Sequence, residues 1–173
     1  MAEFVPFDLD AHKEEYRQLN IEHLAWAIDQ LMENYQLDVY SGSEQTIPEY
    51  VDEHLEDLTS LKPPDGIIYL LVLDGNVVGM GALRKLSDDT GEIKRMYIRP
   101  PYRGRGYGKQ MLSKLLEAGR EFGCSTFLLD TAKFMTAAQH IYRSAGFKER
   151  KEYPESEIPA TFLPYWLFME KVE

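Results

Sequence analysis

The chain has 173 residues, of which 44% are hydrophobic and 28% charged, and its net charge is −10. This length predicts a single domain over residues 1–173 with a substantial core. No apolar run approaches the ~20 residues that span a bilayer, and the acidic balance argues against duplex DNA or an anionic membrane as a partner. The single cysteine excludes an internal disulfide. Together with an N-terminus that lacks the parts of a secretion signal, it predicts a cytoplasmic protein.

The first third of the sequence predicts a short edge strand and two helices. The strand is expected at residues 3–9, and the first helix at 12–36. A second helix starts near Thr46 or Ile47, with Pro48 in its first turn, and Pro63 and Pro64 end it. The apolar residues of the first helix step by three and four along one stripe, formed by Ile21, Leu24, Ile28, Leu31 and Tyr35.

Three antiparallel strands are expected next. Residues 66–73 form an apolar run that Asp74-Gly75 joins to residues 76–86, because this dipeptide favours a two-residue hairpin turn. The third strand begins near Glu92. Alternation predicts one face with Ile93 and Tyr97 and the other with Glu92, Met96 and Ile98.

A basic glycine-rich loop follows the third strand. Pro100 and Pro101 end the strand, and Arg103-Gly-Arg-Gly-Tyr-Gly108 leads into a helical pattern from Met111 onward. Between Lys94 and Lys109 there are six basic residues and no acidic one, although the whole chain is acidic. A glycine loop at a helix N-terminus presents free amides and the positive end of the helix dipole, so we expect a phosphate or pyrophosphate site. The alternative is a solvated basic loop.

The last third predicts one more strand, a helix and two closing strands. The strand at 125–130 is reached through a helix, so it is expected to run parallel to the Glu92 strand by a right-handed crossover. A helix at 134–144 ends at Gly146 in a left-handed conformation. The closing strands are expected at 147–153 and 165–171.

The spacing of glycines in the loop distinguishes between the known phosphate-binding motifs. A Walker A loop would need glycine where Arg103 stands, and a dinucleotide fingerprint would need glycine where Lys109 stands. The pattern that fits is Arg-x-x-Gly-x-Gly at Arg103, Gly106 and Gly108. With the preceding strand and the later run Ile-Tyr-Arg-Ser-Ala-Gly-Phe147, it resembles the acetyl-CoA loop of the GNAT (Gcn5-related N-acetyltransferase) superfamily. The resemblance implies an α/β (α+β) fold with a mixed, mostly antiparallel twisted sheet of about seven strands flanked by helices.

The resemblance also implies how acetyl-CoA binds as co-substrate. Its pantetheine arm would pair with strand backbone at Met96, Tyr97 and Ile98. Its pyrophosphate would lie on the loop amides. Met135 stands where the family usually has a cofactor-binding asparagine, and Thr136 beside it is a possible replacement. The loop residues concerned are Arg103, Gly104, Arg105, Gly106, Tyr107, Gly108 and Lys109.

Two catalytic residues follow from the same resemblance. Tyr142 lies in Ala-x-x-Ile-Tyr-x-x-x-Gly-Phe and would donate a proton or a hydrogen bond to the thiolate leaving group. Glu92 occupies the family's position for a base that helps to deprotonate the amine. An ordinary strand carboxylate is an equal reading of Glu92. Asp88, Asp89 and Asp130 are weaker candidates for the base.

The acceptor is expected to be a primary amine of a small molecule or a protein, with no nucleic acid or membrane partner. The candidate contacts with it are Tyr40, Glu155, Glu157, Phe162 and Trp166, and a loop or homodimer contact explains these residues equally well. The four histidines lack metal-ligand spacing, so no metal is expected. Two alternatives stay open: a non-catalytic acyl-CoA-binding module, and an NTPase or kinase, against which the Walker spacing argues.

Overall fold

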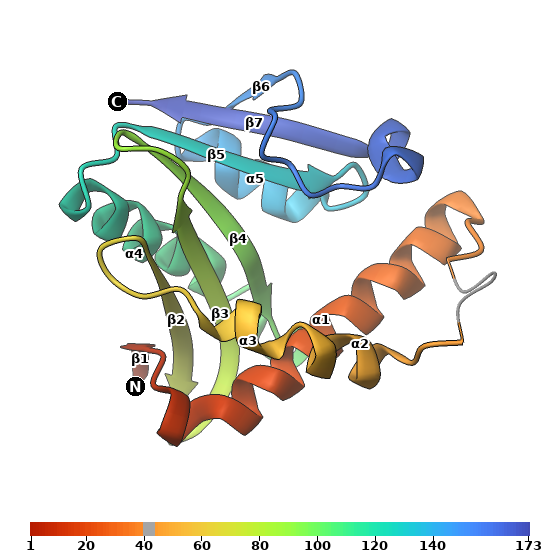
Figure 1. Ribbon diagram of the computed structural model, residues 1–173, viewed down its shortest axis with the longest axis horizontal. Helices are drawn as coiled ribbons and strands as arrows, with labels where there is room; N and C mark the ends of the chain where they lie inside the picture. Colours follow the sequence, from red (N-terminus) through yellow and green to blue (C-terminus); the bar gives the residue numbers. More distant parts are fainter. Residues whose placement is uncertain (40–43) are drawn as a thin grey trace.

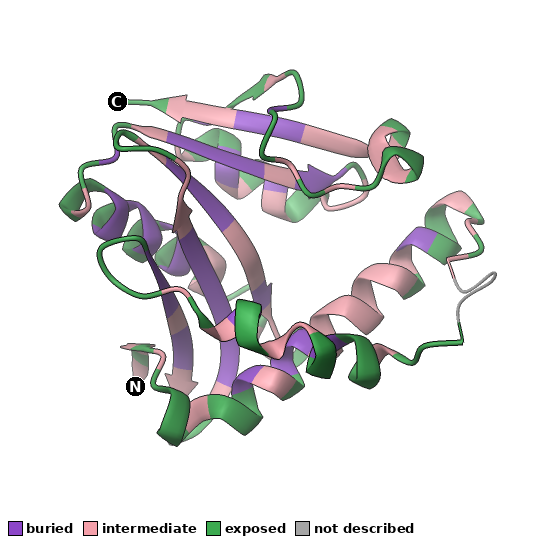
Figure 2. Cartoon of the chain, viewed as in Figure 1, coloured by how far each residue is buried: buried purple, intermediate pink, exposed green. Residues whose placement is uncertain are grey.

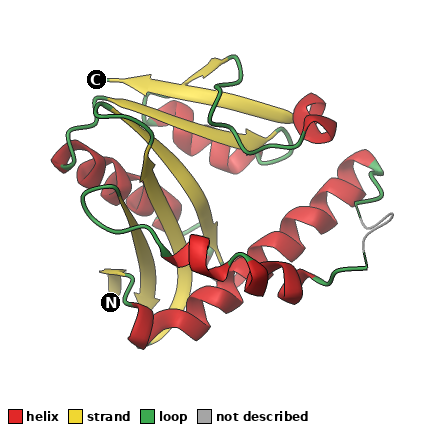
Figure 3. Ribbon diagram, viewed as in Figure 1, coloured by secondary structure: helices red, strands yellow, loops and turns green. Residues whose placement is uncertain are grey.

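The computed structural model describes residues 1–39 and 44–173, which form one seven-stranded sheet with helices on both faces (Figures 1 and 3). The helices are α1 (Leu9–Tyr35), α2 (Ile47–Glu53), α3 (Leu55–Thr59), α4 (Tyr107–Glu121) and α5 (Thr136–Ser144). Two 3-10 turns, η1 (Pro100–Tyr102) and η2 (Ala160–Tyr165), complete the set. The strands are β1 (Ala2–Pro6), β2 (Gly66–Leu73), β3 (Asn76–Lys85), β4 (Thr90–Ile98), β5 (Thr126–Ala132), β6 (Lys148–Arg150) and β7 (Trp166–Val172).

The strand order is β1-β2-β3-β4-β5-β7-β6. All neighbours are antiparallel except β4 and β5, which run parallel and are joined through α4. The expected parallel pairing across a helical connection and the mixed, mostly antiparallel sheet are therefore confirmed. Strand β7 lies between β5 and β6, so the last strand of the chain does not close the sheet edge.

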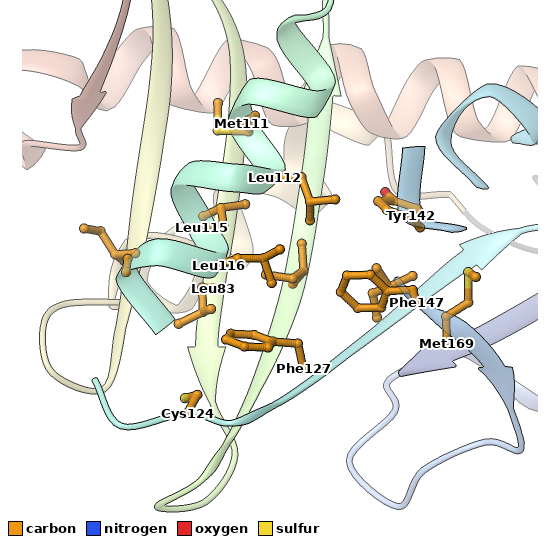
Figure 4. Packing of buried hydrophobic residues seen from close by; sticks show 14 of the residues in the cluster. Leu83, Met111, Leu112, Leu115, Leu116, Cys124, Phe127, Tyr142, Phe147 and Met169 are labelled. Carbon is orange, nitrogen blue, oxygen red and sulfur yellow. The ribbon is translucent and has the colours of Figure 1, made fainter. Parts of the chain in front are cut away.

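Each face of the sheet has its own core. Helices α4 and α5 pack on one face, where Leu115 and Leu116 lie near Leu83 and Phe127, and Met169 lies near Phe147 in the same cluster (Figure 4). On the other face α1, α2 and α3 cover a second cluster, which contains Tyr16, Leu19, Val51, Leu58, Leu70 and Tyr97. In Figure 2 the middle of α1 is mostly half-buried, and several of these residues line a cavity.

The N-terminal helices begin at side-chain caps. Asp8 accepts from the amide of Ala11 at 2.9 Å, so α1 begins earlier than predicted and runs for 27 residues. Thr46 and Glu49 form a capping box at the start of α2, with Pro48 in the first turn as expected. The second predicted helix is divided at His54 into α2 and α3.

Strand β4 contains a bulge that the sequence analysis missed. Tyr97 pairs with Met80 and Lys94 pairs with Ala82, so Arg95 and Met96 together oppose only Gly81. Arg95 takes a φ of 52°, in the left-handed region. The extra residue reverses the alternation beyond it.

The predicted faces of β4 were therefore wrong. Ile93 shares the α4 face with Met96 and Ile98, whereas Tyr97 packs on the α1 face.

No helix within residues 1–39 and 44–173 has the length and apolar character needed to cross a membrane.

Candidate active site

The sheet opens between β4 and β5. Their parallel register runs from Thr90 opposite Thr126 to Ile93 opposite Leu129 and then stops, while β5 continues to Ala132 on the β7 side. Figure 1 shows the two strands diverging beyond this point. A cavity of about 470 Å³, here called the first cavity, occupies the opening. Its wall comes from β4, the η1–α4 loop, α5 and one side of α1.

The glycine loop forms one end of the first cavity. Gly104 and Gly106 have φ values of 75° and 81°, which L-residues rarely adopt. Gly106 is the N-cap of α4 and offers no side-chain cap, so the amides of the first helical turn have no intrahelical acceptor. A Cβ at Gly104 would meet no atom within 4 Å, which leaves open space above the backbone. These features fit an anion held by backbone amides and the helix dipole.

Most residues predicted to bind the cofactor line the first cavity. They are Met96, Tyr97, Ile98, Arg103, Gly104, Gly106, Tyr107, Gly108 and Met135. Arg105 and Lys109 are exposed and do not line it, so their side chains contribute charge near the loop and no wall. Helix α4 begins at Tyr107, so Gly108 and Lys109 belong to its first turn.

Arg103 has its side chain turned back from the loop. Its Nε donates to the carbonyl of Ile98 at 2.8 Å. The guanidinium lies 4.5 Å from the ring centre of Trp26 and 5.4 Å from that of Tyr97. Arg103 therefore links the end of β4 to α1, and only its neighbours present backbone to an anion.

Tyr142 lies on α5, almost fully buried, where it lines the first cavity. Figure 4 shows it near Phe147, and the two ring centres are 6.1 Å apart. Burial raises the pKa of the Tyr142 phenol well above its usual value, and the nearby negative charge of Asp130 raises it further. At neutral pH the hydroxyl is therefore protonated and can act as a donor.

Glu92 is 1% exposed and lines neither of the two cavities described here. Arg84 Nη2 donates to one carboxylate oxygen at 2.7 Å, and the Tyr153 hydroxyl donates to the other at 2.8 Å. The Glu92 carboxylate is thus held in an ion pair with Arg84. It is therefore not an exposed strand carboxylate, and it does not line either of these two cavities.

The other candidate carboxylates lie in two places, Asp130 near the end of β5 and the pair Asp88 and Asp89 in a turn. Asp130 is close to the Glu92 network, where it accepts from Trp166 Nε1 at 2.7 Å, and burial raises its pKa. Asp88 and Asp89 lie in the turn before β4, where Asp89 accepts from Ser87 and Thr90. Only Asp130 is therefore near the opening of the sheet.

A second cavity of about 710 Å³ adjoins the first on the α1 face. Met135 lines both cavities and so marks their junction. Three of the predicted acceptor residues, Glu157, Phe162 and Trp166, line the second cavity. Glu155 contributes only a carbonyl that accepts from Arg84 at 3.4 Å, and Tyr40 lies outside the described residues.

Helix α1 supplies site residues that the sequence analysis did not single out. Trp26 and Gln30 line the first cavity, and Trp26 meets Phe134 edge to face at 5.9 Å. His23 lines the second cavity and stacks on Tyr97 at 5.2 Å. Trp26 lies between the stripe positions of α1, and a large aromatic residue off the apolar stripe was the available signal. Within the described ranges, no group of three or more His, Cys, Asp or Glu side chains is placed to hold a metal ion.

Comparisons with known proteins agree with this geometry. The chain is 34% identical over 147 residues to an IAA acetyltransferase of Azospirillum brasilense, a match that covers 84% of this chain and 90% of that protein. It is 38% identical over 89 residues to human N-acetylaspartate synthetase, covering 51% of this chain and 30% of that protein.

Solved structures share the fold. The PaiA N-acetyltransferase of Thermoplasma acidophilum, in complex with coenzyme A, has a TM-score of 0.69 at 17% identity and covers 100% of this chain and 99% of its own. A GNAT acetyltransferase of Staphylococcus aureus Mu50 has a TM-score of 0.69 at 19% identity and covers 99% of both chains. The model of the acetyltransferase (GNAT) family matches residues 21–147. The strand opening, the glycine loop and the family match agree, and the chain belongs to the GNAT family of acetyltransferases.

Proposed function

We propose that this protein transfers the acetyl group of acetyl-CoA to a primary amine of a small molecule or a protein, by direct attack of the amine nitrogen on the thioester. One observation carries the proposal. The first cavity runs from the free amides of the glycine loop, along the unpaired edge of β4, to the buried hydroxyl of Tyr142. An anion site, a strand edge and a proton donor in one opening suit a long thioester with a diphosphate at its far end.

The loop would hold the diphosphate through backbone amides. Gly104 and Gly106 leave space where a Cβ would stand, so the ligand can approach the chain closely. Arg105 and Lys109 are exposed beside the loop and add positive charge without blocking it. The edge of β4 at Met96, Tyr97 and Ile98 would pair with the amides of the pantetheine arm, since no strand occupies that edge.

Tyr142 would hydrogen-bond to the departing thiolate and pass its proton to sulfur, and it would recover a proton from the attacking amine nitrogen, so that one amine proton ends on the thiol. A thiol has a pKa of ~8.5, below the raised pKa of Tyr142, so the phenol gives up its proton only as the amine nitrogen replaces it. Bound acetyl-CoA supplies an activated acyl group, and the protein's part is to position that group and to stabilise the leaving thiolate.

Glu92 enters the proposal as a positioning residue. Its contact with Arg84, and the contacts of Arg84 and Lys94 with Glu157, hold the β6–β7 loop against the sheet beside the second cavity. Of the described residues lining the two cavities, the carboxylates are Asp57 and Glu157, and both side chains are exposed. The acceptor would therefore react through its unprotonated fraction, and kcat/KM should rise with pH until the free amine is deprotonated.

A panel of amines and peptides, assayed for thiol release from acetyl-CoA, tests the proposal. We expect release that depends on the amine, and acetyl-CoA should raise the thermal midpoint of the protein. Thermal stabilisation with no thiol release across the panel would instead support a non-catalytic binding module. Stabilisation by Mg-ATP and not by acetyl-CoA would point to another phosphate-ligand enzyme.

A further inference from the structure

The second cavity has mostly apolar walls and one unusual charge. Its wall comes from α1, α2, α3 and the β6–β7 loop, and includes Leu24, Ile28, Leu31, Val51, Leu58 and Phe162. Arg95 lines the same cavity from the bulge of β4. The inference below concerns this arginine and rests on the proposed function, since it describes the acceptor of that reaction.

The bulge is what directs Arg95 to this face. In an unbroken strand Arg95 would share the face of Ile93, against the α4 core. Because two residues oppose Gly81, Arg95 shares the face of Lys94 and Tyr97 instead. A non-glycine residue with a positive φ is uncommon and costs on the order of 1 kcal/mol. This conformation therefore indicates that the position of the guanidinium matters more than an unstrained backbone.

Arg95 differs from Arg84, Lys94 and Arg99 in having no acidic partner among the described residues, although nearby Arg103 has none there either. Arg84 and Lys94 pair with Glu92 and Glu157, and Arg99 pairs with Glu22 at 2.8 Å. Within residues 1–39 and 44–173, no carboxylate lies within ion-pair distance of Arg95.

The nearby titratable groups do not neutralise Arg95. It lies near Tyr16 and His23, and both are uncharged at neutral pH: burial raises the pKa of Tyr16 and lowers that of His23 to about 4. Glu157, one of the two described acidic residues that line the cavity, is already held by Arg84 and Lys94. The remaining acidic lining residue, Asp57, is exposed on α3.

We infer that the acceptor amine also carries a carboxylate, which binds the guanidinium of Arg95, and that the rest of the acceptor is largely apolar. The carboxylate would supply the missing negative charge by a charge-assisted, bidentate contact. The apolar walls would contact the side chain of an amino acid or a related amine. The nitrogen would lie toward Met135, where the second cavity meets the first. Arg95 does not line the first cavity, so the phosphates of the co-substrate are not its partner.

The test compares matched acceptors that differ only in the carboxylate. Phenylalanine and phenethylamine, and leucine and isoamylamine, are assayed with acetyl-CoA on the wild-type protein and on Arg95→Gln. In the variant we expect KM to rise about 10- to 100-fold for the two amino acids, the range for a lost hydrogen bond to a charged group. For the two simple amines KM should change little. Arg95→Lys should recover part of the loss, because it keeps the charge without the fork.

Arg120→Gln is the matched control, since Arg120 is a partly exposed arginine of α4 that pairs with Glu173 and lines neither cavity. It should leave the KM of all four acceptors unchanged. Equal effects of Arg95→Gln on acceptors with and without a carboxylate would overturn the inference and leave the proposed function standing. If none of the four acceptors releases thiol while other amines do, the inference fails. If no amine of any kind does, the proposed function fails with it.

Discussion

At the scale of single residues, the site contains side chains whose pKa values are shifted because the side chains are buried. Tyr142 and His23 show the two directions. Burial disfavours the charged form of each side chain. At neutral pH the phenol of Tyr142 is therefore protonated, and the imidazole of His23 is neutral. Each shift leads to a separate measurement.

Replacing Tyr142 with phenylalanine removes the hydroxyl and keeps the ring in the core. We expect kcat to fall by ~100-fold or more, the lower end of the effect of a general acid, while the KM for acetyl-CoA stays nearly constant. Steady-state kinetics with a fixed amine measures both. Tyr69→Phe, a half-buried tyrosine of β2 away from the cavities, is the control. A Tyr142→Phe enzyme with wild-type kcat would remove Tyr142 from the reaction.

His23 predicts a loss of stability in acid. Its pKa is about 4 in the folded protein and ~6.5 when unfolded. The unfolded chain therefore binds the proton more tightly, and the free energy of unfolding falls as the pH drops from ~6.5 to ~4. The shift corresponds to at most ~3 kcal/mol, and the partial exposure of the ring to the cavity reduces it.

Urea titrations at several pH values measure this loss. His23→Gln should unfold with a shallower dependence on pH between 4 and 6.5 than the wild type, because glutamine does not titrate in this window. His140→Gln, at an exposed position of α5, serves as the control and should keep the wild-type slope. The same slope in His23→Gln as in the wild type would show that other groups carry the acid sensitivity.

At the scale of elements, the role of the glycine loop in binding acetyl-CoA can be tested by comparing Gly106 with a glycine of another turn that has nearly the same φ. Gly106 and Gly75 have φ values of 81° and 80°, and Gly75 lies in the β2–β3 hairpin and lines neither cavity. Alanine at either position should cost on the order of 1 kcal/mol of stability, because both impose a left-handed residue. Only Gly106→Ala should also weaken the thermal stabilisation by acetyl-CoA, since only its Cβ would stand over the loop amides. Equal stabilisation of both variants would remove the loop from the binding site.

Several elements were predictable because their signals are local. The sequence gives the limits of β2 through its apolar run and the adjacent Asp-Gly turn, and it gives the start of α2 through Thr46 and Pro48. The bulge at Arg95 has no such signal, since arginine does not mark a left-handed residue as glycine would. The insertion of β7 between β5 and β6 depends on pairing across the chain and cannot be read from periodicity.

The site was predicted in part for the same reason. The loop and Tyr142 lie in short motifs, and both line the first cavity. The second cavity was missed because Leu24, Ile28 and Leu31 have helical spacing, which looks the same whether a stripe faces a core or a cavity. The ion pair of Glu92 was also missed, since Arg84 comes from a different strand.

At the scale of the whole molecule, a polar network that is buried at Glu92 and Tyr153 and exposed at Glu157 joins the two halves of the sheet. Arg84 of β3 contacts Glu92 of β4 and Glu157 of the β6–β7 loop, and Tyr153 reaches Glu92 from the same loop. These contacts connect strands β3 and β4, on one side of the opening, to the β6–β7 loop on the other side. The acceptor side of the site is therefore held in place by charges that take no part in the proposed reaction.

Arg84→Met should break this network and leave Glu92 buried with weaker partners. We expect a loss of ~3 kcal/mol, at the lower end for a broken buried pair because Lys94 remains 3.7 Å from Glu92. The melting temperature should fall by about 6–12 °C, measurable by calorimetry. Arg120→Met removes a more exposed pair with Glu173 and should cost no more than ~1 kcal/mol. Equal losses in the two variants would show that the network adds no stability of its own.

Because Arg95 is the extra residue of the β4 bulge, the charge in the second cavity can be removed without changing the pairing of the rest of the strand. Without Arg95, the sequence Glu92-Ile-Lys-Met-Tyr-Ile would alternate regularly, with Met96 opposite Gly81 and every apolar side chain still on its present face. A chain shortened by this one amino acid would thus satisfy both cores and relieve a strained backbone. Deletion of Arg95 would therefore remove the cationic side chain from the second cavity and leave the apolar contacts of β4 in place.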